Sequence, residues 1–337
     1  DFMAHAGETY FSTSTSADSC LRIFVAGDRS QVGKSSVCLG ILGTLHERLG
    51  YEAHELAYIK PATQCEAPQL VQHYCKSRGI RAVPIGPIVY HKGFTRAFLA
   101  GETESKEALL LKAAKAVNDV CMGKRVVIID GVGFPAVGSI TGTDNASVAK
   151  ACGYPSSTGT STRSPGVVLV GPSGVGNAVD SFHLNATYFL ERQVPVMGGI
   201  FNKLSTDPAN YYSLESCKEQ VTSYFRQFEP SRIPFGFVPV VSELGGTPSS
   251  SETHVGQDVI SKFISVFAQH VNVQRIVDAA STIRDFQDTS TASSEKRLGD
   301  TTEDGGNEER PAKKLKASGL TRDVIEARAR AQGASRS

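Results

Sequence analysis

Short apolar runs alternate with segments of helical periodicity along most of this chain. Apolar runs bounded by glycine, proline or charged residues predict buried strands at 21–26, 55–59, 125–130, 167–170, 194–201 and 233–240. Apolar side chains spaced three and four residues apart predict helices at 37–49, 68–77, 104–120, 145–151, 178–192, 214–228, 255–268 and 271–283. The proline-containing stretch 82–90 predicts a loop or an edge strand. This alternation predicts an α/β fold with a doubly wound, mostly parallel sheet.

Polar segments set the expected limits of this domain. Residues 1–20 are rich in Ser and Thr, and residues 286–337 are rich in charged and small polar residues, so we expect disorder on both sides of one α/β domain at 21–285. The Ser/Thr-rich stretch 156–164 predicts a flexible insertion. Within the tail, 320–331 predicts a short isolated helix. A basic cluster at 310–316 has the composition of a nuclear-import signal, or of a solvated charge run.

The segment after the first predicted strand has the composition of a phosphate-binding loop. It reads Gly27-Asp28-Arg29-Ser30-Gln31-Val32-Gly33-Lys34-Ser35-Ser36 and leads into the helix predicted at 37–49. Backbone N–H groups of such a loop, and the partial positive charge of the next helix, bind phosphate. We therefore expect nucleotide contacts from Gly27, Gln31, Val32, Gly33, Lys34, Ser35 and Ser36. The alternative is a turn that merely begins a helix.

Two side chains of this loop have expected roles in nucleotide chemistry. Lys34 would reach the β- and γ-phosphates of ATP, and the hydroxyl of Ser35 would contact Mg²⁺. The spacing is unusual, because five residues rather than four separate Gly27 from Gly33.

Other polar residues follow directly from predicted strands, whose carboxyl ends share one edge of a parallel sheet. Asp130 would bind Mg²⁺, which prefers oxygen ligands, or would simply form a turn. Lys60 joins Lys34 as a candidate catalytic residue, because a cation there would stabilise a phosphoryl group or hold a carboxylate substrate; an ordinary surface lysine is the alternative. Asn202 would read an adenine edge or end its strand. The glycines of 131–133 and 171–176 fit close ligand approach and tight turns equally well.

Composition narrows the class of protein further. The 337 residues carry a net charge of +1, which gives no strong case for nucleic acid as a partner. No apolar run approaches the length of about 20 residues that crosses a membrane. Seven cysteines, an odd number without a C-x-x-C pair or a secretory signal, favour reduced thiols and an intracellular protein, cytoplasmic or nuclear.

Taken together, these motifs resemble the dethiobiotin synthetase family and its P-loop relatives, including the N-terminal domain of long phosphate acetyltransferases. The family loop, Gly-Thr-Asp-Thr-x-Val-Gly-Lys-Thr, has the spacing of residues 27–35. Its Lys-Pro pair matches Lys60-Pro61, its Glu-Gly-Ala-Gly-Gly matches 130–134, and its base-binding Asn matches Asn202. The stretch 132–150 is closer to the phosphate acetyltransferases.

This resemblance covers residues from about 20 to 245. It implies a fold of the P-loop NTPase type that binds ATP and Mg²⁺, and a homodimer with the substrate pocket between subunits. Within it, two functions stay open. One is an ATP-dependent ligase that phosphorylates a small carboxylate or carbamate of unknown identity, and the other is a non-catalytic nucleotide-binding regulatory or assembly protein.

Departures from the family pattern affect the substrate site. Arg29 stands where the family has Asp, and Gln64-Cys65 replaces a Ser-Gly pair. The family has a Mg²⁺-binding Asp on the next helix, whereas Glu66 is the only acid in residues 61–90. We therefore expect dethiobiotin synthesis itself to be absent or feeble.

Overall fold

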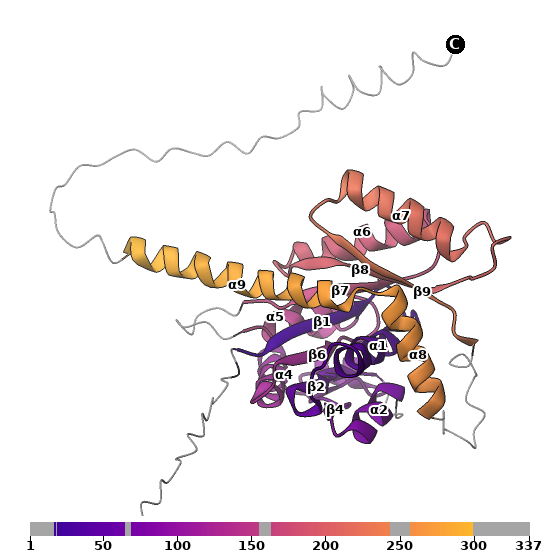
Figure 1. The fold of residues 1–337 in the computed structure, drawn as a ribbon. Coiled ribbons are helices and arrows are strands. Elements are labelled where there is room, and N and C mark those ends of the chain that lie inside the picture. Colours follow the sequence, from indigo (N-terminus) through magenta and orange to yellow (C-terminus); the bar gives the residue numbers. More distant parts are fainter. Residues whose placement is uncertain (1–16, 18, 65–68, 155–162, 243–256, 299–337) are drawn as a thin grey trace, which may run out of the picture. The chain divides into compact units, whose positions relative to one another are not determined.

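The computed structural model describes residues 17, 19–64, 69–154, 163–242 and 257–298, with side chains as far as residue 285 (Figure 1). Most of the chain predicted as disordered at 1–20, 156–164 and 286–337 lies outside these described residues. So do the helix predicted at 320–331 and the basic cluster at 310–316. Contacts divide the chain after Ala292, and the sheet described below belongs to the first unit.

A seven-stranded sheet forms the centre of this unit. Its strand order is β4-β2-β6-β1-β7-β8-β9, and every pairing in it is parallel. The strands are β1 (Leu21–Gly27), β2 (Leu56–Ile59), β4 (Arg81–Val83), β6 (Val126–Asp130), β7 (Gly166–Gly171), β8 (Val196–Leu204) and β9 (Ile233–Pro239). A separate pair joins β3 (Ala62–Thr63) and β5 (Ile88–Val89). The proline-rich stretch 82–90 thus contributes the edge strand β4.

Helices cover both faces of the sheet (Figure 1). One face is covered by α1 (Lys34–Glu47), α2 (Leu70–Arg78), α8 (Gln257–His270) and, as far as Ile283, α9 (Val273–Leu298). The other face is covered by α4 (Lys106–Cys121), α5 (Asn145–Ala151), α6 (Gly176–Leu190) and α7 (Leu214–Phe228). A short helix, α3 (Phe94–Leu99), precedes α4. This arrangement confirms the predicted α/β fold, a doubly wound parallel sheet of the P-loop NTPase type.

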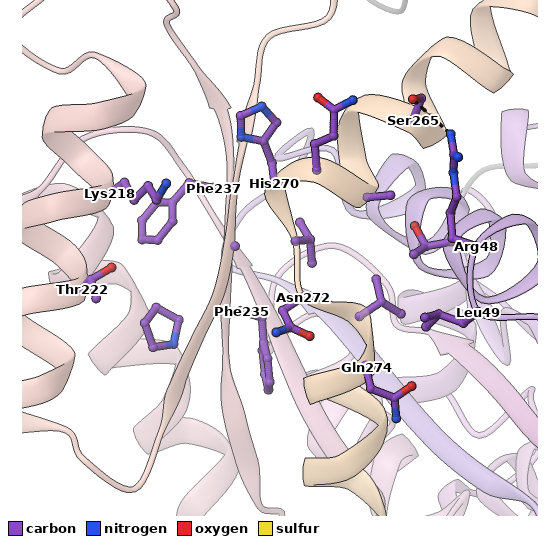
Figure 2. Close-up of a pocket in the computed structure, with 17 residues that line it drawn as sticks. Arg48, Leu49, Lys218, Thr222, Phe235, Phe237, Ser265, His270, Asn272 and Gln274 are labelled. Atoms are coloured by element: carbon purple, nitrogen blue, oxygen red, sulfur yellow. Dashed lines mark hydrogen bonds between the residues drawn. The ribbon is translucent and has the colours of Figure 1, made fainter.

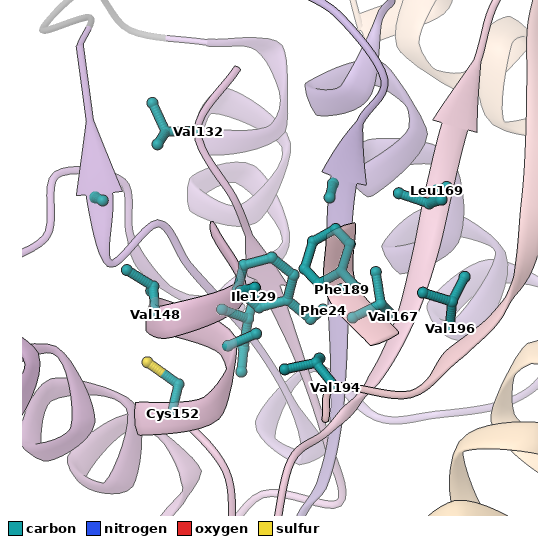
Figure 3. Close-up of a cluster of buried hydrophobic side chains, with 14 of the residues drawn as sticks. Phe24, Ile129, Val132, Val148, Cys152, Val167, Leu169, Phe189, Val194 and Val196 are labelled. Atoms are coloured by element: carbon teal, nitrogen blue, oxygen red, sulfur yellow. The ribbon is translucent and has the colours of Figure 1, made fainter. Parts of the chain in front are cut away.

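The apolar strands read as continuous runs because both of their faces are buried. Successive residues of β1 alternate between two cores, with Phe24 in one and Ile23 and Val25 in the other. Figure 3 shows Phe24 beside Ile129 of β6 and near Phe189 of α6. The rings of Phe24 and Phe189 lie edge to face, with centroids 6.4 Å apart. These contacts hold α6 against the strands that carry the phosphate-loop segment.

Most element boundaries differ from the predicted ones, and three of the differences have a clear physical basis. Helix α4 begins after Ser105, two residues later than predicted, because the hydroxyl of Ser105 accepts a hydrogen bond from the N–H of Ala108 at 3.2 Å. Strand β8 continues past Asn202 to Leu204, which still pairs with β9. Helix α9 continues past residue 285 to Leu298, since no glycine or proline interrupts 284–298. The helical backbone therefore extends beyond the domain limit expected at 285.

Two further findings concern the chemistry of the chain as a whole. None of the helices in the described part of the chain combines the length and the apolar character needed to span a bilayer. The six cysteines in that part of the chain are free and buried.

The contact between α1 and α8 gives a test of the packing. A Cβ atom at Gly40 would lie 2.4 Å from the ring of Phe267, so Gly40→Ala must displace α8 or the ring. We expect this substitution to lower the free energy of unfolding by about 1–3 kcal/mol in urea denaturation. Gly176→Ala is the control, because no heavy atom lies within 4 Å of its Cβ position. An equal free energy of unfolding for Gly40→Ala and the parent would contradict this packing.

Candidate functional site

The segment between β1 and α1 forms a tight loop that needs glycine at its end. Gly33 has a φ of 93°, and a Cβ atom there would lie 2.3 Å from Nδ2 of Asn202. That Nδ2 donates to the carbonyl of Val32 at 2.9 Å. Beside it, Nζ of Lys203 donates to the carbonyl of Gln31 at 2.7 Å. The end of β8 therefore fixes the loop from one side.

The loop presents a row of backbone donors. Within the described residues, the N–H groups of 30–36 donate to no carbonyl or side chain, whereas Val37 donates to the carbonyl of Gly33. Such unpaired N–H groups are typical of a helix N-terminus, which also carries a partial positive charge. An anion with several oxygens, such as a chain of phosphates, would satisfy them.

A buried carboxylate lies next to the loop at the end of β6. The side chain of Asp130 is 0% exposed and forms an ion pair with Lys34. Its Oδ2 accepts hydrogen bonds from the hydroxyls of Tyr58 at 2.7 Å and Ser35 at 3.3 Å. Nζ of Lys60 lies 4.0 Å from the same oxygen. Two ammonium groups thus share one buried carboxylate.

The register of the sheet brings these residues together. Val25 of β1 pairs with Asp130 of β6, and Ile59 of β2 pairs with Ile129. Lys60 directly follows Ile59, so it reaches the sheet edge at the level of Asp130. Parallel strands therefore place the predicted strand-end residues in one cluster.

The surroundings of Asp130 keep its carboxyl group ionised. Burial alone would raise the pKa of Asp130, but the positive charges of Lys34 and Lys60 and the hydrogen bonds it accepts hold that pKa below its ordinary value. Burial and the charge of Asp130 raise the pKa of Tyr58, so its hydroxyl keeps its proton and remains a donor. Burial and Asp130 likewise raise the pKa of the Cys38 thiol. Two ammonium groups and one carboxylate leave one positive charge in excess.

A cavity of about 500 Å³ takes in most of the predicted site. Its lining residues come from the loop and from the segments after β2 and β6: Arg29, Ser30, Gln31, Val32, Gly33, Lys34, Ser35, Ser36, Lys60, Gln64, Gln69, Val132 and Gly133. Gly27 and Asn202, which were predicted to contact nucleotide, do not line it, and neither does Asp130, the predicted metal ligand, which lies behind Lys34. The glycines of 171–176 also lie outside the lining.

Sequence reasoning missed the roles of two buried side chains. Tyr58 was part of a predicted strand with no assigned role, although the strand period of two places it on the same face as Lys60. Asn145 was part of the helix predicted at 145–151 with no further role, and Asp144 caps that helix, α5. The side-chain oxygen of Asn145 instead accepts a hydrogen bond from the N–H of Val132 at 2.8 Å, which fixes the segment after β6.

The oxygen donors beside the loop fit Mg²⁺. The hydroxyl of Ser35 donates to Oδ2 of Asp130, which brings that hydroxyl and the Asp130 carboxylate to the same part of the sheet edge. The described residues contain no group of three His, Cys, Asp or Glu side chains that could hold a metal ion. An ion that keeps several waters and binds through one or two protein oxygens plus phosphate suits such a site.

A larger cavity, of about 740 Å³, lies beside β9 at the sheet edge (Figure 2). Lys218 and Thr222 of α7 line one side of it, and Arg48 and Ser265 line the other. None of the predicted site residues lines this cavity. Arg48 stands at the C-terminal end of α1, where a positive side chain offsets the partial negative charge of the helix, and it donates to the hydroxyl of Ser265 at 3.2 Å. Nζ of Lys218 lies 4.0 Å from a carboxylate oxygen of Glu215 on its own helix, so both cations have partners within the protein.

Comparison with known proteins agrees with the fold and the loop. A family model described as an AAA domain matches residues 21–248, which include every strand of the seven-stranded sheet. No curated protein matches the sequence.

Several solved structures are similar at low identity. A plasmid partition protein from Borrelia burgdorferi B31, bound to AMPPNP, is 13% identical with a TM-score of 0.42, over 77% of this chain and 97% of that one. A ParA family ATPase from Chlorobium tepidum TLS is 8% identical with a TM-score of 0.39, over 80% and 98%. A nucleotide-binding protein from Archaeoglobus fulgidus, in complex with ADP, is 13% identical with a TM-score of 0.37, over 75% and 90%. Likeness at this level identifies neither a substrate nor a partner.

The charge cluster predicts a specific pH dependence of stability. Because the pKa of Asp130 is lowered below its ordinary value of 3.8 in the folded protein, the unfolded chain binds more protons in acid. The carboxylate therefore stabilises the fold above about pH 4, and this contribution is lost as the pH falls further. We expect Asp130→Asn to lower the free energy of unfolding by about 3–5 kcal/mol at pH 7, and by less toward pH 3.

Asp119→Asn, at an exposed aspartate of α4, is the control for this measurement, which uses urea denaturation between about pH 3 and pH 8. A difference between parent and Asp130→Asn that grows as the pH falls would contradict the assignment.

Proposed function

The chain belongs to the AAA domain family and is a nucleotide-binding protein of the P-loop type, and we propose that its nucleotide is ATP, bound together with Mg²⁺. One observation carries the proposal most directly. Two buried ammonium groups surround one carboxylate beside a loop whose N–H groups donate to no described residue. Positive charge in excess and unpaired donors at one place favour a ligand with several negative oxygens.

Each residue of the cluster has a proposed part in binding. The N–H groups of 31–36 hold the phosphate oxygens, and Lys34 turns from Asp130 to the β- and γ-phosphates. Ser35 and Asp130 supply the protein oxygens for Mg²⁺. When bound, this ion neutralises phosphate charge and orients the terminal phosphoryl group. Gly27 and Asn202 shape the loop from outside the cavity.

We further propose that the protein transfers the terminal phosphoryl group to a small anionic acceptor, a carboxylate or carbamate. Lys60 supports this step, because it lines the same cavity and its side chain is only 8% exposed. As Lys34 turns to the phosphates, Lys60 remains to hold Asp130 and to attract the acceptor. Catalysis of this kind needs only positioning and electrostatic stabilisation.

A non-catalytic regulatory or assembly role is the alternative, and one observation favours it. Residues 69–90 contain no acid, so α2 lacks the second metal-binding Asp that the resemblance to dethiobiotin synthetase implies. The same resemblance leads us to propose a homodimer. The free, buried cysteines suit a reducing compartment, in the cytoplasm or the nucleus.

Substitution of Lys34 tests nucleotide binding. Lys34→Ala removes the ammonium that would contact the phosphates but leaves Asp130 paired with Lys60, so the fold should persist. We expect calorimetry to show no measurable Mg²⁺-ATP binding, with an unchanged circular dichroism spectrum. Lys112→Ala, on the exposed side of α4, should bind ATP as the parent does. Equal affinity of Lys34→Ala and the parent would refute the proposed site.

Substitution of Lys60 separates catalysis from binding. We expect Lys60→Met to weaken Mg²⁺-ATP binding far less than Lys34→Ala does, because Lys34 and the loop remain and Mg²⁺ would offset the Asp130 charge that Lys60 no longer pairs with. Acceptor-dependent ATP turnover, assayed with a panel of small carboxylates and carbamates, should fall at least about 100-fold. Turnover equal to that of the parent would remove Lys60 from the mechanism. If the parent protein binds ATP but none of the tested acceptors supports ATP turnover, the regulatory role is favoured.

A further inference from the structure

The two oxygens of the Asp130 carboxylate have different surroundings. Oδ1 contacts Nζ of Lys34. Oδ2 accepts the hydroxyl of Tyr58 at 2.7 Å and the hydroxyl of Ser35 at 3.3 Å, and it lies 4.0 Å from Nζ of Lys60. Oδ2 is therefore held by several groups of the sheet edge. Among the described residues, Oδ1 is held only by Lys34, whose ammonium group could instead contact a bound phosphate.

Tyr58 is the most rigid of the groups on Oδ2. It lies in the middle of β2 with 0% of its surface exposed, between strands β4 and β6. Its register partner in β6 is Ile128, two residues before Asp130, so donor and acceptor lie on adjacent, parallel strands. A buried tyrosine in a central strand has no alternative rotamer without losing its packing. By contrast, Lys60 lies in the loop after β2, and Ser35 lies in the first turn of α1, so their side chains are less confined.

We propose that Tyr58 is a positioning residue for the metal ligand Asp130, an inference that rests on the proposed function. Its hydroxyl anchors Oδ2 and fixes the plane of the carboxylate. Oδ1 would then keep a constant place when Lys34 turns to the phosphates, and it would be available as a ligand for Mg²⁺. Partners that orient a metal ligand in this way commonly change metal affinity 10–100-fold when they are removed.

This positioning role differs from that of a hydrogen bond that only offsets the cost of burying the Asp130 carboxylate. A purely structural hydrogen bond would affect the free energy of unfolding, and it would affect nucleotide affinity equally with and without metal. A positioning role instead predicts a specific change in Mg²⁺ affinity, while the nucleotide affinity measured in EDTA is unchanged. The two roles therefore separate in a binding experiment that needs no turnover.

Tyr58→Phe keeps the ring and removes only the hydroxyl, and the chain offers a matched control. Tyr74 of α2 is 1% exposed, and its hydroxyl donates to a carboxylate oxygen of Glu47 at 3.1 Å. Tyr74→Phe thus removes the same kind of hydrogen bond from the same face of the sheet, away from Asp130. The full chain is titrated with Mg²⁺ in the presence of saturating ADP, and with ADP in EDTA, by calorimetry.

We expect Tyr58→Phe to weaken Mg²⁺ binding at least about tenfold, with ADP affinity in EDTA within about twofold of the parent. Tyr74→Phe should leave both affinities unchanged. Equal Mg²⁺ affinity of Tyr58→Phe and the parent would overturn the inference while leaving the nucleotide site in place. A parent protein that binds ADP neither with nor without Mg²⁺ would instead overturn the proposed function itself.

Discussion

A buried carboxylate shared by two ammonium groups is the interaction on which the centre of this molecule depends. An unpaired charge at Asp130 would cost several kcal/mol, so the fold must bring cations to it. Lys34 comes from the loop after β1, and Lys60 comes from the end of β2. The strands on either side of β6 must therefore keep their register for the charge to be tolerated, which couples the stability of the sheet to the geometry of the phosphate loop.

The same interaction explains why the cluster is suited to a changing set of partners. Lys34 is held by the carboxylate in this structure, and it stands at the same helix end as the N–H groups of 30–36, which have no partner among the described residues. A phosphate chain would offer Lys34 a second anion close to the first. Asp130 would not be left without a counter-charge, because Lys60 remains near its other oxygen and Tyr58 donates to it. The exchange of partners thus avoids a buried, unpaired charge at each stage.

Sequence was sufficient for the fold and for most of this cluster, for physical reasons. Continuous apolar strands, such as the one that ends at Asp130, mark a sheet buried on both faces, and its parallel topology then places the strand ends together. What sequence could not give was the partner of each side chain. Tyr58 read as one strand residue among others, and Asn145 as the first residue of a short helix, because their hydrogen bonds are made to residues in other elements. The helix predicted at 271–283 was made too short, because no glycine or proline marks its end and composition was the guide.

The central claim is that Lys34 changes partners when nucleotide binds. The most direct test is a crystal structure of the full chain with Mg²⁺ and a non-hydrolysable ATP analogue. The account predicts that Nζ of Lys34 has left Asp130 and contacts phosphate oxygens, while the hydroxyl of Tyr58 still donates to Oδ2. An analogue bound in the cavity beside β9, with the ion pair between Lys34 and Asp130 intact, would contradict it.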